Sequence, residues 1–382
     1  MSMLPRLICS DAVPSQHELP ETQETMRYIL TIVEQLDRAA RELLTDHPIN
    51  SRLALVLIDN ATELVVHRQC TDRLEHDNFW TEMHEAAQAI ARDNPEAEID
   101  DHSTSALLRP EQREKIRGRL LKPRLHVLEE MGDLSGVERE FISIAHDYRN
   151  ELYHVGLRHD SIIRAVAGQY FLLCCDLFVR MGQLSPFKYS WSSTDEYTSV
   201  ARRYLPTRNG DIDVLSVDKS RLADKLRGAL PHGLPDLSAV LAHNAHECIL
   251  KVQKDFGFLV QENPFGLDAQ KMLEAAQWQH DLAEAIQKKD LIGHWVDADY
   301  REGYVRIAAD LEADWTQPHT AIPIESWTRR ATSLGNETDP LKALARYKSL
   351  RNSMSYLEDS ITSAAVDLDQ WIQVEIDKAR GK

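Results

Sequence analysis

The sequence predicts an all-α protein built from two similar helical bundles. Apolar residues recur at helical spacing through most of the 382 residues, strand-like alternation is scarce, and landmarks of the first half return in the same order in the second. These observations divide the chain into a loosely held arm at 1–24, a helical domain at 25–183, a connector at 184–217 and a second helical domain at 218–382.

The first half carries several helical patterns. An amphipathic stripe runs through residues 29–43, and the next segment, Leu53–Val66, is apolar on nearly all sides, as expected for a helix at the centre of a core. A separate helix is expected at Asn78–Arg92, an acidic loop at 94–105 and a strongly apolar helix at Ser161–Met181.

The central segment Leu53–Val66 contains three polar residues that its surroundings must satisfy. Asp59 and Glu63 are four residues apart and therefore share a helix face, and Asn60 lies beside them. Because buried polar groups need hydrogen-bond partners, we expect these three to face another polar helix or a cleft.

A nine-residue stretch, His146–His154, concentrates functional side chains. It combines Arg149, Asn150 and His154 in helix-compatible sequence, and Asn150 and His154 share one face. The guanidinium offers a planar cation for a phosphate, and an imidazole exchanges protons near neutral pH. The alternative interpretation of such a cluster is the solvated face of an amphipathic helix.

A basic run precedes this stretch. Between Arg109 and Arg124 there are seven basic and two acidic residues, in a chain whose formal net charge is −17. The contrast favours a phosphate-facing role, and a solvated helix face is the alternative. The RNA-binding candidates are Arg113, Arg117 and Arg119.

The second half repeats the landmarks. Leu237–Leu250 matches Leu53–Val66 at six of fourteen positions without a gap, and Asn60 and Glu63 return as Asn244 and Glu247. Arg149 and Asn150 return as Arg351 and Asn352, and Tyr356 stands at the position that corresponds to His154. We interpret the chain as a duplicated helical domain with a degenerate second copy.

Composition narrows the class of protein. The hydrophobic fraction of 43% allows substantial cores, and 61 acidic against 44 basic residues exclude nucleic-acid binding through bulk charge. The five cysteines are odd in number and show no CxxC or zinc-site spacing, which argues against a disulfide framework and predicts a reducing compartment. The sequence shows no secretory signal and no apolar run of membrane-spanning length. We therefore expect a cytoplasmic protein away from membranes. His243, His246 and Glu247 lack the order of a metalloprotease motif, and no metal site is expected.

The motif Arg149-Asn-Glu-Leu-Tyr-His154 resembles that of the HEPN superfamily (higher eukaryotes and prokaryotes nucleotide-binding domains), in which an arginine precedes a histidine by a short spacer. The polar residues 59–63 resemble the patch that many members carry on an earlier helix. The resemblance covers 25–183, and reaches 218–380 only through the internal repeat.

This resemblance implies a helical bundle paired with a second bundle, and a metal-independent endoribonuclease site at their interface without a cofactor. Arg149, Asn150 and His154 are then the catalytic candidates, with RNA as substrate. Many similar proteins are toxins or antiviral defence effectors, so an antitoxin or a defence-system protein is an expected partner.

Two arrangements of the site stay open. The copies can pair within one chain as an intramolecular pseudo-dimer, with Asn60 and Glu63 supporting and Arg351, Asn352 and Tyr356 as the second half-site. Alternatively, two chains pair through their first copies as a homodimer and restore two histidines. Two further functions also remain: a non-catalytic helical module that binds RNA or a nucleotide, and an interaction protein whose Arg-Asn helices hold the halves together.

Overall fold

The computed structural model describes residues 20–93, 108–154, 160–181, 198–205, 207–208, 211–212, 217–230, 232–288 and 298–380. These residues form helices almost throughout, which confirms the predicted all-α class. One short antiparallel pair, β1 (Thr207–Arg208) with β2 (Asp211–Ile212), is the exception within the described chain.

The chain forms two compact units, Met1–Leu234 and Pro235–Lys382. This boundary lies later than the connector expected at 184–217. The reason is that α7 (Thr198–Tyr204) packs on α1 (Pro20–Leu44), and α8 (Lys219–Gly228) packs on α6 (Asp160–Arg180) and α1. Part of the expected connector and the start of the expected second domain therefore belong to the first unit.

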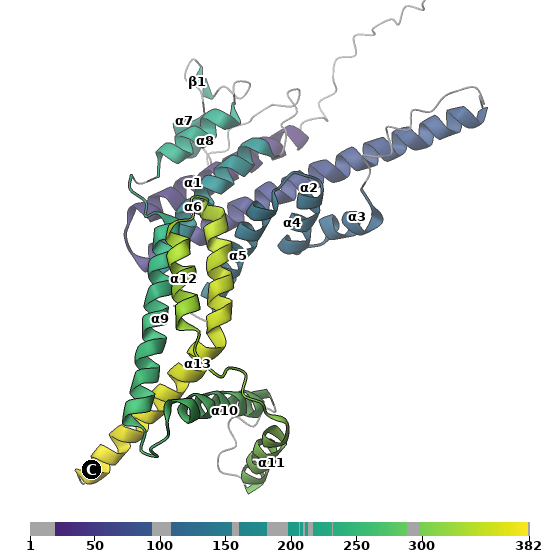
Figure 1. The fold of residues 1–382 in the computed structure, drawn as a ribbon. Coiled ribbons are helices and arrows are strands. Elements are labelled where there is room, and N and C mark those ends of the chain that lie inside the picture. Colours follow the sequence, from purple (N-terminus) through teal and green to yellow (C-terminus); the bar gives the residue numbers. More distant parts are fainter. Residues whose placement is uncertain are drawn as a thin grey trace, which may run out of the picture. The chain divides into compact units, whose positions relative to one another are not determined.

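The core of the first unit surrounds α2 (Pro48–Asp93), against which α1 and α6 pack along their lengths (Figure 1). The apolar face of α1 contributes Ile29, Ile32 and Leu36, which are completely buried, as the amphipathic stripe predicts. Shorter helices α3 (Pro110–Arg117), α4 (Leu121–Glu130) and α5 (Gly136–His154) cover a further side of α2. The helix expected from residue 25 begins at Pro20, inside the expected N-terminal arm.

The two helices expected at Leu53–Val66 and Asn78–Arg92 are one continuous helix of 46 residues. The sequence between them contains no glycine or proline, so nothing interrupts the backbone hydrogen bonds. The residues between the two segments are mostly polar, and α2 leaves the core beyond Asp77, as the exposed Phe79, Met83 and Ile90 indicate.

Helix α6 is the apolar helix expected at Ser161–Met181. Contrary to the expectation from sequence, its segment Ser161–Arg180 is long and apolar enough to meet a length-and-composition test for a membrane span. In the folded unit 72% of that segment is buried, which is typical of a core helix packed between α2, α8 and α5. Gly168 lies where a Cβ would come within 3.0 Å of Leu234.

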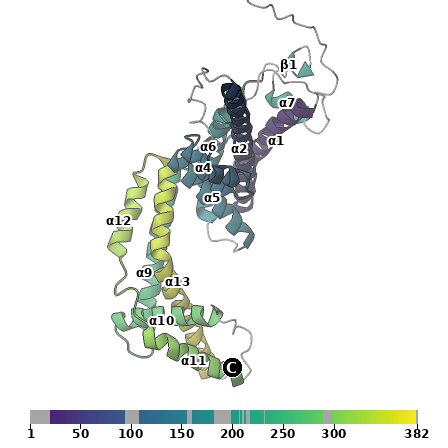
Figure 2. The same cartoon turned by 90° about the vertical axis from the view of Figure 1, so that its right-hand side faces the viewer.

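The second unit is built on α9 (Leu237–Glu262), which packs against α13 (Pro340–Ala379) and α12 (Ile324–Gly335) (Figure 2). Helix α10 (Ala269–Lys288) packs on α13, and α11 (Ala298–Asp314) packs on α10. The neighbours of α9 therefore differ in connectivity from those of α2: the helix before α2 packs on it within the same unit, whereas α8, the helix before α9, packs in the first unit.

Candidate functional site

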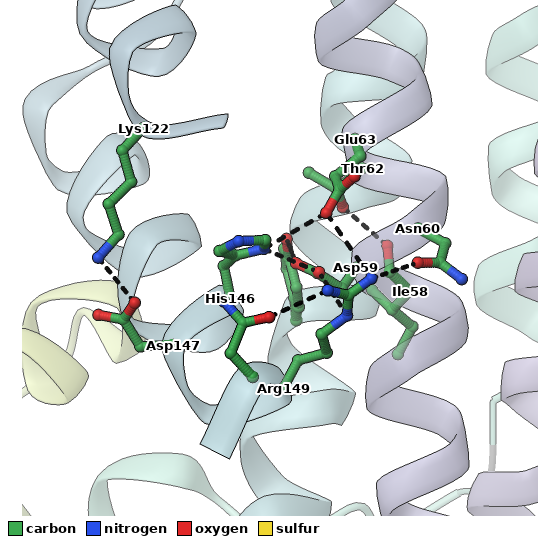
Figure 3. A network of polar contacts seen from close by, with 11 residues as sticks. Ile58, Asp59, Asn60, Thr62, Glu63, Lys122, His146, Asp147 and Arg149 are labelled. Atoms are coloured by element: carbon green, nitrogen blue, oxygen red, sulfur yellow. Dashed lines mark hydrogen bonds and ion pairs between the residues drawn. The ribbon is translucent and has the colours of Figure 1, made fainter. Parts of the chain in front are cut away.

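The polar residues of the central helix α2 meet α5 at a buried carboxylate. Asp59 has no exposed surface, and its Oδ1 accepts a hydrogen bond from the hydroxyl of Tyr170 on α6 at 2.9 Å. Its Oδ2 lies 2.9 Å from Nδ1 of His146 and 3.4 Å from Nε of Arg149, both on α5 (Figure 3). Asp59 thus joins the three helices, which confirms the expectation that the polar residues of α2 face another polar helix.

Helix α5 presents Arg149 and His146 to α2 because of how it begins and how it packs. Ser135 and Glu138 form reciprocal hydrogen bonds at its N-terminus, with the Ser135 amide 2.8 Å from the Glu138 carboxylate. Phe141 and Ala145 are completely buried and fix the rotation of the helix about its axis.

Arg149 lies between the two helices, half-buried. Its Nη2 donates to Oδ1 of Asn60 at 3.1 Å (Figure 3). Its Nη1 donates to Oδ1 of Asn150 at 3.0 Å. Oε1 of Glu63 is 3.9 Å from Nη2, a long ion pair. Four of the residues singled out from sequence, Asn60, Glu63, Arg149 and Asn150, are therefore neighbours in the first unit.

Two titratable groups in this cluster have shifted pKa values. The hydrogen bond to Asp59 raises the pKa of His146, and Glu63, 3.4 Å away, acts in the same direction. Burial raises the pKa of Glu63, and the neighbouring negative charge of Asp59 adds to that rise. Each of these two side chains therefore keeps its proton to a higher pH than it would in water.

His154 is the last residue of α5, and its side chain lies outside the described residues. The helical backbone from Arg149 to His154 advances roughly 7.5 Å along the axis at 1.5 Å per residue. The predicted role of His154 stays a prediction.

Asp59, Glu63 and His146 form a set of metal-ligand side chains that the sequence analysis did not anticipate. One ligand atom from each lies within 4.8 Å of the other two. However, Arg149 approaches the same carboxylate oxygens, and its fixed positive charge opposes a cation there. The donor set is better matched to the guanidinium that it already holds.

The basic run is divided between α3 and α4, and its three RNA-binding candidates differ in surroundings. Nε of Arg113 is 2.6 Å from the buried carboxylate of Asp77, so this arginine is part of a structural ion pair. Arg117 is exposed, whereas Arg119 lines a pocket together with Asn60 and Glu63. The pocket also contains Arg124, which the sequence analysis did not select.

The residues of the expected second half-site have partners within their own unit. Arg351 on α13 forms an ion pair with Glu358 at 2.7 Å, and the hydroxyl of Tyr356 donates to Asp281 on α10 at 3.0 Å. Asn352 is exposed. Asn244 on α9 accepts a hydrogen bond from the hydroxyl of Tyr347 on α13.

Sequence reasoning included His146 in the stretch His146–His154 but not among the catalytic candidates, and it missed Tyr170 entirely. A signal for His146 was present: it is three residues before Arg149, so both side chains share one face of α5. Tyr170 gave no comparable signal, because an aromatic residue in an apolar helix is typical of a core.

Comparisons of the chain with protein-family models, with curated proteins and with solved structures give no match.

Proposed function

We propose that this protein is a metal-independent endoribonuclease of the HEPN type, a toxin or antiviral defence effector, with Arg149, Asn150 and His154 as its catalytic residues. The observation that carries the proposal is the position of the Arg149 guanidinium, which two amide oxygens orient at 3.1 and 3.0 Å. The guanidinium also lies 3.4 Å from Asp59 and 3.9 Å from Glu63, which orient it further. Its planar fork matches the geometry of phosphate oxygens, which supports a role in binding a phosphate.

The chemistry needs a base, an acid and a stabilising cation. A base removes the proton from a ribose 2′-hydroxyl, and the 2′-oxygen attacks the adjacent phosphorus. The bond from phosphorus to the 5′-oxygen breaks, and an acid protonates that oxygen. The products are a 2′,3′-cyclic phosphate and a 5′-hydroxyl, with no net change in protons. Arg149 stabilises the charge on the phosphorane oxygens.

The first unit offers two imidazoles for the two proton transfers. His154 is the first, from the motif. His146 is the second: Asp59 orients it through Nδ1, and Nε2 makes no hydrogen bond within the described residues. The raised pKa of His146 places more of it in the protonated form near neutral pH, which suits the general acid.

The arrangement of two similar bundles belongs to the same proposal. It is supported by the recurring residues and by one shared feature: the helix with the Arg-Asn pair packs on the central helix in each unit. In the in-chain version, Arg351, Asn352 and Tyr356 complete the site, with Asn60 and Glu63 supporting it. In the homodimer version, two first units supply two sets of Arg149 and His154.

A non-catalytic role is the second candidate, and one observation favours it. Asp59, Arg149, His146 and Tyr170 satisfy one another across α2, α5 and α6, which is also how a structural polar cluster is built. The same cleft would then hold RNA or a nucleotide without cleaving it.

The deciding experiment is incubation of the purified protein with labelled RNA in EDTA, beside Arg149→Ala and His154→Ala. We expect cleavage by the wild type and its loss in both variants, with unchanged helical circular dichroism and thermal unfolding. RNA binding without cleavage would support the non-catalytic module, and cleavage restored only by a divalent ion would contradict the proposal.

A further inference from the structure

We propose that the pocket between α1, α2 and α4 binds the RNA nucleotide next to the cleaved bond, with its phosphate on Arg119 and Arg124 and an N–H donor of its base on Gln35. This inference rests on the proposed function and names a subsite of it.

The pocket is of the size and composition of a small-ligand site. Its volume is about 350 Å³, and its lining comes from three helices and the turn before α4: Gln35, Asn60, Glu63, Leu64, His67, Arg119, Leu121 and Arg124. Leu64 and Leu121 provide apolar surface on which the face of a base can pack. Asn60 and Glu63 belong both to this lining and to the Arg149 cluster, so the pocket and the cluster share one wall.

Among the described residues, neither arginine of the pocket is paired with a carboxylate. In the described part of the chain, no Asp or Glu lies within ion-pair distance of Arg119 or Arg124. Other cations of the run, Arg109, Arg113 and Lys122, each have one. In an acidic protein, two uncompensated guanidinium groups at one pocket form a local anion site.

His67 and the orientation of Arg124 add to the description of the pocket. The pKa of His67, which lies in the pocket, is lowered by burial and then by the charges of Arg124 and Arg68. His67 is therefore neutral at neutral pH and can exchange hydrogen bonds with a ligand. Nε of Arg124 donates to the carbonyl of Ile116 at 3.1 Å, which fixes its orientation.

Gln35 supplies a second feature that a ligand can recognise, a buried hydrogen-bond acceptor. Its Oε1 is buried and accepts no hydrogen bond within the described residues, although it lines the pocket. A buried acceptor without a donor costs about 1–3 kcal/mol, so a ligand that brings an N–H or O–H group there is favoured. The ligand must therefore carry an anion and a separate hydrogen-bond donor, a combination that a nucleotide has.

The position of the pocket indicates which nucleotide this is. Asn60 faces the pocket and holds the Arg149 guanidinium. A strand whose scissile phosphate lies on Arg149 continues past Asn60 into the pocket, where Arg119 and Arg124 meet its next phosphate.

The test is a binding titration with a short, fully 2′-O-methylated RNA, which lacks the attacking hydroxyl and so separates binding from cleavage. We expect Arg119→Gln to weaken binding about tenfold and to reduce the salt slope by about 0.7, the value for one phosphate contact with a single strand. Arg119 is exposed, so this variant is expected to fold normally. Lys115→Gln removes the same charge from an exposed site outside the pocket and serves as the matched control.

RNA binding by Gln35→Leu is a second, independent test. It removes the acceptor and no charge, so binding should weaken about tenfold with an unchanged salt slope. Inorganic phosphate and a 5′-mononucleotide, added as competitors, distinguish the sources of the anion. The mononucleotide should displace the RNA at lower concentration than phosphate in the wild type, and this preference should vanish in Gln35→Leu.

Equal effects of Arg119→Gln and Lys115→Gln would overturn the proposal, as would unaltered binding in Gln35→Leu. Failure of the nuclease proposal is distinguishable: the wild type would then leave unmodified RNA intact, whatever these binding titrations give.

Discussion

Asp59 carries no exposed surface, and its two oxygens hold three side chains from two other helices. A carboxylate is stable in such a place only because Tyr170, His146 and Arg149 replace the water it lost. These contacts fix the orientation of His146 and Arg149.

Replacing Asp59 should therefore cost much more than replacing Tyr170. We expect Asp59→Ala to lower the free energy of unfolding by about 3–5 kcal/mol, because it leaves the buried positive partners unpaired. Tyr170→Phe should cost only about 1 kcal/mol, the value of one hydrogen bond. Urea unfolding measures both, and equal costs would show that the carboxylate is not the centre of the cluster.

His146 should make stability depend on pH. The hydrogen bond to Asp59 raises its pKa above the ordinary value of 6.5, so the folded protein binds this proton more tightly than the unfolded chain. The stabilisation is fully present below about pH 6.5 and is lost as the pH rises through the folded-state value.

We therefore expect His146→Gln to lose stability relative to the wild type at about pH 6, and to lose less at about pH 9. Urea midpoints across this range measure the difference. Because Glu63 and Arg149 also face His146, the comparison should be repeated with Glu63→Gln present in both proteins. A difference that does not change with pH would contradict the linkage.

At the scale of elements, helical periodicity located the helices at 29–43, 53–66 and 161–181 but not the ends of helices. The apolar pattern at Leu53–Val66 placed the central helix correctly because one face of this segment is buried throughout. It failed beyond Val66, where polar residues predominate and the helix continues because no glycine or proline interrupts it. The spacing of Asp59 and Glu63 predicted a shared face, yet only folding brings that face to His146 and Tyr170, which are distant in sequence.

The basic run is a second case in which the sequence alone is insufficient, because a count of charges does not reveal which of them form ion pairs. Arg113 is held by Asp77, whose side chain is 1% exposed, and also donates to Thr81 at 2.9 Å. Arg117 is exposed. The two should therefore respond differently to substitution.

We expect Arg113→Ala to lower the free energy of unfolding by about 3 kcal/mol, because it leaves the Asp77 carboxylate buried and unpaired. Arg117→Ala should leave stability within about 0.5 kcal/mol of the wild type.

Reversal of Arg113, Arg117 and Arg119 to Glu should weaken RNA binding and flatten its salt dependence. If the salt dependence of RNA binding did not change, the basic run would be a solvated helix face that does not contact RNA.

At the scale of the whole molecule, the question is whether the second unit contributes to the site. Arg351 already pairs with Glu358, and Tyr356 with Asp281, so each has a role inside its unit. The in-chain site predicts that Arg351→Ala reduces RNA cleavage even so.

Because Arg351→Ala leaves Glu358 without its partner, the double variant Arg351→Ala/Glu358→Ala is the stability control. Loss of activity in both variants, with folding intact, is the predicted result for the in-chain site. Full activity in both, beside an inactive Arg149→Ala, would make a homodimer of first units the better description.

The 3′ end of the RNA product tests the central claim most directly, because it records which oxygen attacked phosphorus. We predict that cleavage in EDTA leaves a 2′,3′-cyclic phosphate and a 5′-hydroxyl, and that Arg149→Ala yields neither. Products with a 3′-hydroxyl and a 5′-phosphate, formed only with a divalent ion, would contradict the account and return Asp59, Glu63 and His146 to consideration as metal ligands.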